Sequence, residues 1–531
     1  MYTLKAPTGI GKTFTILELS ERLNQINGGK YKIIYGLPLT SIIDQNYDVL
    51  ENILEFNLKE EYEKYPSKYL IKDHYLSDLK IEENQETKNF SDVLNSELLL
   101  KSWCSSHIVT TFVQIFHSVL GNTNNLLRKF HNMSNSIIIM DEIQSIPPKY
   151  HKIWGKIIKV LAKNFKIYFI FLTATQPEIL SEEDYIDLSN ENVNRDEEFN
   201  RVVVKTIKNL MPITIDVFLD EFKNVFKGSN VLLVMNTKDS ALTAYKELKK
   251  MYLDYEVISL TGFKASIDRS KTIEYIKRKL RKKEKIIVVA TQLVEAGVNL
   301  DFDLGFRDLT TFDSLVQFCG RINRNNDLKP QKGEVYVFNL QTNYGQAYAE
   351  QVYRESIPLL NITKNILTTR KDIYSKDFMD LSKEYFRLVK ENYQYESDRI
   401  LDAIKILNFG NYAHRKEIAI DKIKLIENND TRRIIICKTK EINEKVLRLK
   451  ECLKKSSEIF EFEEKKDLYI EIKKISKELS QYEVVVRKKH IKPYKDILKT
   501  IKEDDLYFAD YENFEKIYSK DIGFKKKEGR K

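Results

Sequence analysis

Short apolar runs, each long enough for one β-strand, alternate along most of the first 290 residues with stretches of helical apolar spacing. The first such stretch places Ile16, Leu17, Leu19 and Leu23 on one helix face. The runs that predict strands, one of them continuing into a helix, are residues 2–4, 33–37, 108–116, 137–140, 166–172, 231–235, 256–260 and 286–290. Because strands that alternate with helices form parallel sheets covered on both faces, we expect an α/β protein with mostly parallel sheets.

Changes in composition divide the chain into three predicted domains. A polar and acidic stretch at residues 190–200, followed by two short connecting strands, separates domains 1–208 and 209–345. Beyond residue 346 the sequence is rich in Lys and Glu, which predicts a mainly α-helical domain, 346–531. Within it, residues 441–482 are typical of a pair of solvated helices, and residues 420–425 and 432–437 of two strands. A length of 531 residues fits about two to four domains.

Charge and cysteine usage limit the class of protein. The 87 Lys and Arg residues against 78 Asp and Glu give a net charge of +9, which is compatible with a nucleic-acid partner but does not establish one. The four cysteines are scattered without C-x-x-C spacing, so we expect reduced thiols and neither disulfides nor a zinc site. No signal peptide or membrane-spanning run is recognisable, which predicts a cytoplasmic protein.

A phosphate-binding loop is predicted between the first strand and the first helix. Its backbone N–H groups can turn towards phosphate oxygens at Gly9 and Gly11, Lys12 can reach the outer phosphates, and the Thr13 hydroxyl can bind magnesium. The predicted nucleotide contacts are Ala6, Thr8, Gly9, Ile10, Gly11, Lys12 and Thr13. The alternative is a turn without a ligand, which Gly-Lys-Thr at a strand–helix junction disfavours.

Two acidic residues follow the buried strand at residues 137–140. Asp141 is placed to hold a magnesium ion together with Thr13, and Glu142 to orient and deprotonate an attacking water. The alternative is that both carboxylates cap a helix. The phosphate loop upstream favours the catalytic interpretation.

Small polar residues recur where predicted strands end. They include Pro38 and Thr40, Thr111 and Gln114, the run Thr173 to Gln176, Asn236 with Thr237, and Thr291. Parallel sheets bind ligands at the carboxyl ends of their strands, so these residues are candidates for phosphate contacts. Ordinary helix capping, by Thr40 or Ser41, is an equal alternative for the stretch at residues 38–45.

Arginine-containing stretches of the second domain have two possible roles. Arg321 and Arg324 follow Gln317 and stand three apart, so on a helix they would share a face and could bridge to phosphates held by the other domain. Surface arginines at this spacing are common, so the pair alone is a weak signal. The basic run 277–283 is most simply a solvated helix face, with nucleic-acid contact as the alternative.

The order of these motifs resembles that of the superfamily-two helicases. Residues 38–45, 109–114, 141–144, 173–177 and 290–297 are similar to the CRISPR-associated helicase of type I systems, which is the helicase part of a helicase–nuclease. The resemblance covers roughly residues 1–340 and continues weakly beyond. It implies two tandem RecA-like P-loop domains and a helical accessory domain that closes over a DNA channel.

The resemblance also implies a function and its residues. The expected activity is ATP-driven, magnesium-dependent 3′-to-5′ translocation on single-stranded DNA, which unwinds target DNA for an RNA-guided surveillance complex in antiviral defence. Catalytic roles fall to Lys12, Asp141, Glu142, Gln317, Arg321 and Arg324, and further nucleotide contacts to Gly297 and Asp301. The expected nucleic-acid contacts are Pro38, Thr40, Thr111, Gln114, Asn236, Thr237 and Thr291.

Three departures from the family pattern shape the alternatives. Five residues precede the phosphate loop, so the family's adenine-reading segment is expected to be absent and the chain to be truncated. No His is followed by Asp, so a separately encoded HD-type nuclease is expected, or none. Asn299 replaces an expected Asp, while Asp301 is present. The alternatives are a hydrolysis-deficient nucleic-acid-binding remnant and a superfamily-two helicase of another branch that acts on RNA.

Overall fold

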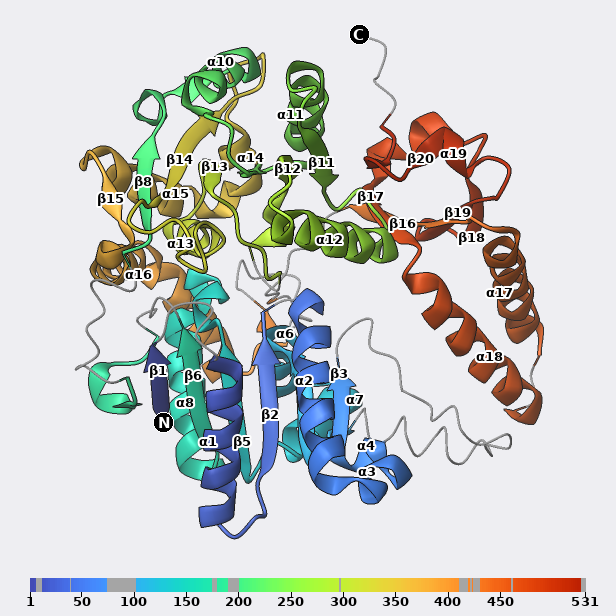
Figure 1. The fold of residues 1–531 in the computed structure, drawn as a ribbon. Coiled ribbons are helices and arrows are strands. Elements are labelled where there is room, and N and C mark those ends of the chain that lie inside the picture. Colours follow the sequence, from blue (N-terminus) through green and yellow to red (C-terminus); the bar gives the residue numbers. More distant parts are fainter. Residues whose placement is uncertain are drawn as a thin grey trace. The chain divides into compact units, whose positions relative to one another are not determined.

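The computed structural model describes residues 1–5, 12–38, 40–73, 102–173, 179–189, 200–295, 298–409, 419–420, 423, 430–459 and 462–526 (Figure 1). The chain forms two compact units. Unit 1 comprises residues 1–200, 311–320 and 361–427, and unit 2 comprises residues 201–310, 321–360 and 428–531. Each unit is therefore assembled from three separate segments, whereas the predicted domains are contiguous.

A parallel sheet forms the centre of unit 1, with the strand order β3-β4-β2-β5-β6-β1-β7. Its strands are β1 (Tyr2–Lys5), β2 (Lys32–Leu37), β3 (Leu70–Asp73), β4 (His107–Thr111), β5 (Ser136–Asp141), β6 (Tyr168–Thr173) and β7 (Ile186–Asp187). All of the strands predicted for this region are present, and β3 and β7 are additional.

Helices cover both faces of this sheet, as expected (Figure 1). They are α1 (Lys12–Ile26), α2 (Thr40–Leu58), α3 (Glu60–Lys64), α4 (Pro66–Tyr69), α6 (Phe112–Leu120), α7 (Asn124–His131) and α8 (His151–Phe165). Alternate residues of β5 enter two different cores: Ile138 packs in the core with α6 and α8, and Ile139 in the core with α1 and α2. Because both faces of β5 are buried, the strand reads as a continuous apolar run.

Unit 2 contains a second parallel sheet, with β11, β12, β10, β13, β14 and β8 side by side in this order. Its strands are β8 (Val202–Thr206), β9 (Pro212–Ile213, beside β14), β10 (Val231–Val234), β11 (Glu256–Leu260), β12 (Ile286–Ala290), β13 (Leu304–Asp308) and β14 (Gly333–Leu340). The main helices around it are α10 (Ile215–Val225), α11 (Lys238–Met251) and α12 (Ser266–Arg281). The sequence did not predict β13, whose apolar run is interrupted by Arg307, or β14, which begins with Gly333 and Glu334.

Shorter elements connect the second sheet to the C-terminal part. They are α13 (Phe312–Cys319), α14 (Tyr348–Val352), α15 (Ile357–Thr368), β15 (Ile373–Tyr374) and α16 (Phe378–Lys405). Within unit 1, Phe312 of α13 packs against Phe378 and Tyr385 of α16. None of the helices in the described part of the chain is long and apolar enough to cross a membrane.

Residues 430–526, which we call the C-terminal module, combine a helix pair with a small sheet. The predicted pair is present as α17 (Lys440–Glu458) and α18 (Phe462–Ser480), joined by Arg448 and Glu471 at 2.6 and 2.9 Å. The sheet has the order β17-β16-β19-β18, from β16 (Thr431–Ile436), β17 (Glu483–Arg487), β18 (Lys499–Lys502) and β19 (Leu506–Ala509). It is followed by α19 (Phe514–Ile517), β20 (Tyr518–Ser519) and β21 (Gly523–Phe524).

The mainly helical character expected beyond residue 346 is confirmed, and β16 matches the strand predicted at residues 432–437. Most of the strand predicted at 420–425 lies outside the described residues. The sequence did not predict β17 to β19. Outward-facing positions alternate with buried ones in β17, and this mixed pattern hides a short strand among charged residues.

The C-terminal module shares a hydrophobic core with the second sheet's domain. Phe263 and Ala265, which precede α12, are buried among residues of β16, β17, β20 and β21. The backbone N–H of Phe524 donates to the Phe263 carbonyl at 2.8 Å, and Lys438 and Tyr518 both bond the Asp268 carboxylate. The C-terminal module is thus a fixed part of unit 2.

Candidate nucleotide and nucleic-acid site

The predicted magnesium ligands of unit 1 are brought together by Tyr35. Asp141 ends β5, and its Oδ2 accepts a hydrogen bond from the Tyr35 hydroxyl at 2.9 Å. Tyr35 also hydrogen-bonds with Thr13, in the first turn of α1. Burial, followed by the charge of Asp141, raises the pKa of Tyr35 well above its usual value, so the phenol stays protonated. The sequence missed Tyr35 because it stands inside an apolar run and reads as a core residue.

A second polar chain orients Glu142. The residue adopts a left-handed backbone conformation, with φ of 58°, and its N–H donates to the Leu172 carbonyl at 2.9 Å. The side-chain amide of Gln144 donates to the Glu142 carboxylate, and the Thr173 hydroxyl donates to Gln144 Oε1 at 2.6 Å. Glu142 is therefore connected to the ends of both β5 and β6.

The strand and helix that flank the predicted phosphate loop are both present. β1 ends at Lys5, opposite Thr173 of β6, and α1 begins at Lys12. The predicted contacts Ala6, Thr8, Gly9, Ile10 and Gly11 lie outside the described residues, as does the side chain of Lys12.

Hydroxyl and carboxylate oxygens are the ligands that magnesium prefers, and its sites commonly use one or two protein oxygens together with phosphates. Thr13 and Asp141, which share Tyr35 as a partner, fit such a site.

Asp301 of unit 2 holds the segment that follows α13. Its Oδ1 accepts from the backbone N–H of Arg324 at 2.6 Å, and its Oδ2 from that of Asn325 at 2.9 Å. Burial raises the pKa of Asp301, and these two hydrogen bonds oppose the rise. Gly297 lies outside the described residues, and Asn299 is exposed.

The expectation that Arg321 and Arg324 share a helix face is wrong. Helix α13 ends at Cys319 and is capped by Gly320, and Asn323 adopts a left-handed conformation with φ of 45°. Arg321 is only 6% exposed, and its guanidinium donates to the carbonyls of Val294 at 3.1 Å and Glu295 at 2.7 Å. Arg321 therefore fastens the segment after β12. Gln317 lies on α13 and is half-buried.

Several predicted nucleic-acid contacts act as helix caps. Thr111 Oγ1 accepts from the N–H of Gln114 at 3.2 Å at the start of α6, and Thr237 Oγ1 from that of Ser240 at 3.0 Å at the start of α11. Thr291 is buried and precedes the 3₁₀ turn Gln292–Val294. Pro38 follows β2 and is half-buried, and Thr40 begins α2, with its side chain outside the described part.

Two buried cations that the sequence did not single out lie beside the remaining contacts. In unit 1, Lys129 donates to Gln114 Oε1 at 2.9 Å and to Asp73 Oδ2 at 2.6 Å. In unit 2, Arg307 donates to Asn236 Oδ1 at 2.8 Å, and Asn236 donates to the Leu309 carbonyl at 2.7 Å. Both cations have partners far away in the sequence, so no local pattern identifies them.

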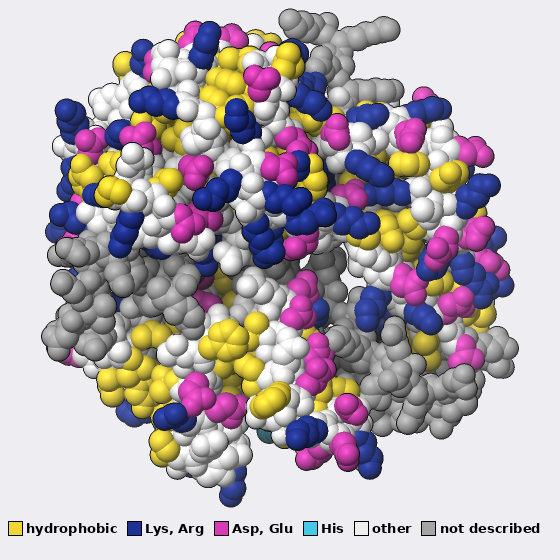
Figure 2. Space-filling model, in the orientation of Figure 1, with side chains coloured by type: hydrophobic (Ala, Val, Ile, Leu, Met, Phe, Trp, Pro, Cys, Tyr) yellow, Lys and Arg dark blue, Asp and Glu magenta, His cyan; other side chains and the backbone are white. Residues whose placement is uncertain are grey.

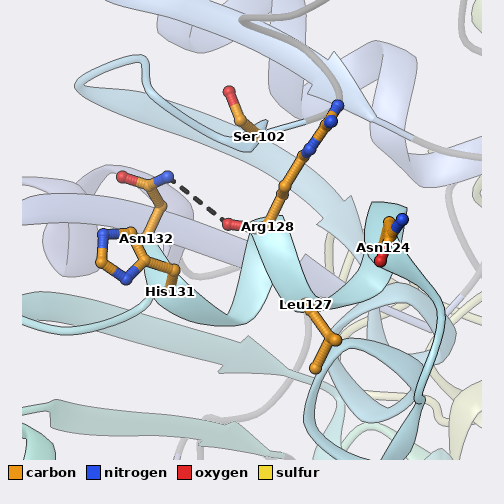
Figure 3. Close-up of a pocket in the computed structure, with 6 residues that line it drawn as sticks. All are labelled: Ser102, Asn124, Leu127, Arg128, His131 and Asn132. Atoms are coloured by element: carbon orange, nitrogen blue, oxygen red, sulfur yellow. Dashed lines mark hydrogen bonds between the residues drawn. The ribbon is translucent and has the colours of Figure 1, made fainter.

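Two other surface features contain none of the predicted site residues. A cavity beside α7 is lined by Ser102, Asn124, Leu127, Arg128, His131 and Asn132 (Figure 3). Lys and Arg side chains also gather over α12 (Figure 2). Several of the basic residues of α12 form salt bridges. Lys279, for example, pairs with Glu256 at 3.1 Å and also with Glu284.

Known proteins match both α/β units. A family model described as DEAD/DEAH box helicase matches residues 1–182, and one described as CRISPR-associated nuclease/helicase Cas3, C-terminal, matches residues 227–327. The CRISPR-associated nuclease/helicase Cas3 of Haloferax volcanii is 24% identical over 439 residues, which cover 64% of this chain and 46% of that protein. The corresponding protein of Methanothermobacter thermautotrophicus is 24% identical over 349 residues, which cover 62% and 39%.

Solved structures share the fold. The T. fusca Cas3–AMPPNP structure superposes with a TM-score of 0.67 at 15% identity and covers 96% of this chain and 65% of that one. A CRISPR RNA-guided surveillance complex, pre-nicking, gives a TM-score of 0.56 at 14% identity, with 96% and 64% covered. This chain thus spans half or less of the length of these two curated relatives.

The architecture is that of two tandem RecA-like domains followed by a mainly helical region. The helicase models match in the order that the motifs predicted. The resemblance inferred from the motifs is therefore confirmed: this chain is similar, across both α/β units, to the CRISPR-associated nuclease/helicase Cas3 proteins, and its residues 1–182 match the DEAD/DEAH box helicase model.

Proposed function

We propose that this chain is an ATP-dependent DNA translocase and helicase of a type I CRISPR interference system. It moves 3′ to 5′ on single-stranded DNA and unwinds target DNA at an RNA-guided surveillance complex in the cytoplasm. The observation that carries the proposal is the cluster at the carboxyl edge of the first sheet. There, the Tyr35 hydroxyl joins Thr13 to Asp141, and Glu142 follows directly.

Each residue of the cluster has a role in ATP hydrolysis. The loop from Ala6 to Lys12 binds the phosphates, and Thr13 and Asp141 hold magnesium, which neutralises charge on the outer phosphates. Glu142 accepts the proton of the attacking water. The Gln144 amide and the Thr173 hydroxyl hold the Glu142 carboxylate in place, so little reorganisation is needed at the moment of reaction.

The remaining predicted residues complete the proposal. Gln317 and Arg324 stabilise the charge of the transferring phosphoryl group. Arg321, whose guanidinium is bonded to the Val294 and Glu295 carbonyls, holds the segment after β12 in place, and Gly297 and Asp301 shape the segment that faces the nucleotide. The nucleic-acid backbone is bound by Pro38, Thr40, Thr111, Gln114, Asn236, Thr237 and Thr291. A separately encoded HD-type nuclease cuts the unwound strand, so the isolated chain is expected to leave DNA uncut.

The proposal predicts that Glu142→Gln abolishes turnover and preserves nucleotide binding. The amide cannot accept the proton of water, so we expect ATP turnover to fall about 100-fold or more, while ATP affinity changes by less than about threefold. The measurement is phosphate release with magnesium, with and without single-stranded DNA. Glu18→Gln, an exposed residue of α1 paired with Arg22, is the matched control and should behave as wild type.

Three outcomes would contradict parts of the proposal. Wild-type turnover no higher than that of Glu142→Gln, with DNA present, would favour a binding remnant. Stimulation by RNA and not by DNA would favour another helicase branch. DNA cutting by both the wild type and Glu142→Gln, in proportion to the purified chain, would overturn the assignment of cutting to another polypeptide.

A further inference from the structure

Arg307 is a wholly buried cation near the end of β13. Its Nη1 donates to Asn236 Oδ1 and to the Asp308 carbonyl, both at 2.8 Å. On the other side, its Nε lies 2.7 Å from Glu295 Oε1. One guanidinium therefore contacts the segment after β10 and the segment after β12 at the same time.

The chain of contacts continues beyond Arg307 in both directions. Asn236 donates onward to the carbonyl of Leu309, which fixes the amide on the side away from Arg307. At the other end, Arg321 donates to the backbone carbonyls of Val294 and Glu295. Three edge segments of unit 2 are thus joined through Asn236, Arg307, Glu295 and Arg321.

The chemistry of position 307 indicates that Arg307 does more than fill space in the hydrophobic core. Removing a cation from water costs several kcal/mol unless paired groups compensate, and an apolar residue of similar size often serves stability as well. The preceding residues of β13, Leu304 and Phe306, are buried and apolar. Through its Nη1, Arg307 bonds two acceptors in fixed directions while its Nε faces Glu295, an arrangement that Lys, with a single compact ammonium, cannot reproduce.

We propose that Arg307 is a positioning residue that sets Asn236 and residues 291–295 in one fixed arrangement for binding the backbone of a nucleic-acid strand. The proposal rests on the proposed function, which assigns Asn236, Thr237 and Thr291 to the strand. Arg307 has no exposed surface and therefore acts through these neighbours and not by touching the strand.

The test compares Arg307→Lys, Glu295→Gln and the double variant. Each single variant weakens a charge-assisted contact of Arg307. Each should therefore raise the single-stranded DNA concentration needed for half-maximal ATPase stimulation about tenfold. The KM for ATP should change less than about twofold. Because both single variants interrupt the same series of contacts, the double variant should lose little more of the DNA response than either single variant.

Arg433→Lys is the matched control, because it also replaces a paired arginine of unit 2 by lysine. Arg433 is on β16 of the same unit and pairs with Asp505 at 3.0 Å, away from the three edge segments. We expect this variant to leave the half-saturating DNA concentration within about twofold of wild type. Unfolding midpoints of all variants show whether a change in DNA response merely follows a loss of stability.

The outcomes separate the two proposals. A normal DNA response in Arg307→Lys, or a DNA defect of equal size in Arg433→Lys, would overturn the positioning role alone. Parallel losses of DNA response and of ATP affinity in Arg307→Lys would also overturn it, because they indicate general disruption. A wild-type chain that neither binds nor responds to DNA would refute the proposed function and the positioning role with it.

Discussion

Asp308, the last residue of β13, has a carboxyl group whose charge depends on burial. It is fully buried, and its Oδ1 accepts from the Leu340 N–H at 3.0 Å. Burial raises its pKa from 3.8 to about 7, against the opposing effects of that hydrogen bond and of Arg307. The folded protein therefore binds a proton between about pH 4 and 7 that the unfolded chain has already released. The resulting stabilisation is complete below the unfolded pKa and is lost as the pH rises through about 7.

Asp308→Asn is expected to remove this contribution to the pH dependence. The amide oxygen can still accept a hydrogen bond from the Leu340 N–H and carries no charge. The free energy of unfolding of the variant should therefore increase relative to that of wild type as the pH rises from 5 to 8. The measurement is the free energy of urea unfolding at several pH values, with the exposed Asp254→Asn as the surface control. Parallel profiles for wild type and Asp308→Asn would show that Asp308 is not the titrating group.

Residues with a local sequence signal could be predicted, and those with only distant partners could not. Asp141 and Glu142 follow an unbroken apolar strand, and the confirmed strand places them at the sheet edge. Tyr35 and Arg307 lie inside strands, so the sequence pattern around them indicates core positions and gives no sign of a functional role. Their partners lie 106 and 71 residues away, at Asp141 and Asn236, and only the fold brings them together.

At the scale of elements, buried parallel strands were predictable and helix ends were less so. Long apolar runs identified β5, β6, β10 and β12, because strands buried on both faces need apolar residues throughout. The helix predicted to continue through Arg321 and Arg324 stops at Cys319, where Gly320 and then Asn323 turn the chain. In the sheet of the C-terminal module, β16 was predicted, and β17 to β19 were missed because they are short and partly exposed.

Gly523, the first residue of β21, tests how tightly that module is attached. Gly523 has φ of +80°, and a Cβ there would lie 2.2 Å from the Phe263 carbonyl oxygen. Gly523→Ala should therefore suffer both backbone strain and a backbone clash. We expect it to lower the free energy of unfolding by about 3 kcal/mol or more, as measured by chemical denaturation.

Gly345→Ala separates the two causes. Gly345 has the same φ of +80°, but nothing lies within 4 Å of the added Cβ. This variant should cost only the backbone term, about 1–2 kcal/mol. Equal losses in the two variants would mean that the close approach to Phe263 contributes nothing.

At the scale of the whole molecule, the distribution of charge sets the response to salt. The net charge is +9, and Lys and Arg are concentrated over α12 (Figure 2). Our interpretation of α12 is a solvated helix face, since Lys277 and Lys279 are paired with Glu274 and with Glu256. In the proposed function, the DNA backbone is bound instead by the sheet-edge segments.

This interpretation predicts that DNA affinity falls steeply with salt but does not depend on α12. Each phosphate contact of a single strand contributes about −0.7 to the slope of log K against log salt. The triple variant Arg278→Ala, Arg281→Ala, Lys282→Ala should change that slope by less than about one contact. Fluorescence anisotropy at several salt concentrations provides the measurement. A loss of about two or more contacts would assign α12 to the DNA.

The shared core around Phe263 and Ala265 has a consequence for how the chain is made. Strands β8 to β14 have all been synthesised once residue 340 is reached, but the groups that cover Phe263 and Ala265 lie between residues 434 and 524. At about 5–20 residues per second, roughly 10–40 s pass between these points. During that interval an apolar patch faces the solvent beside an otherwise formed sheet. A nascent chain stalled near residue 430 is therefore expected to bind a chaperone through this patch.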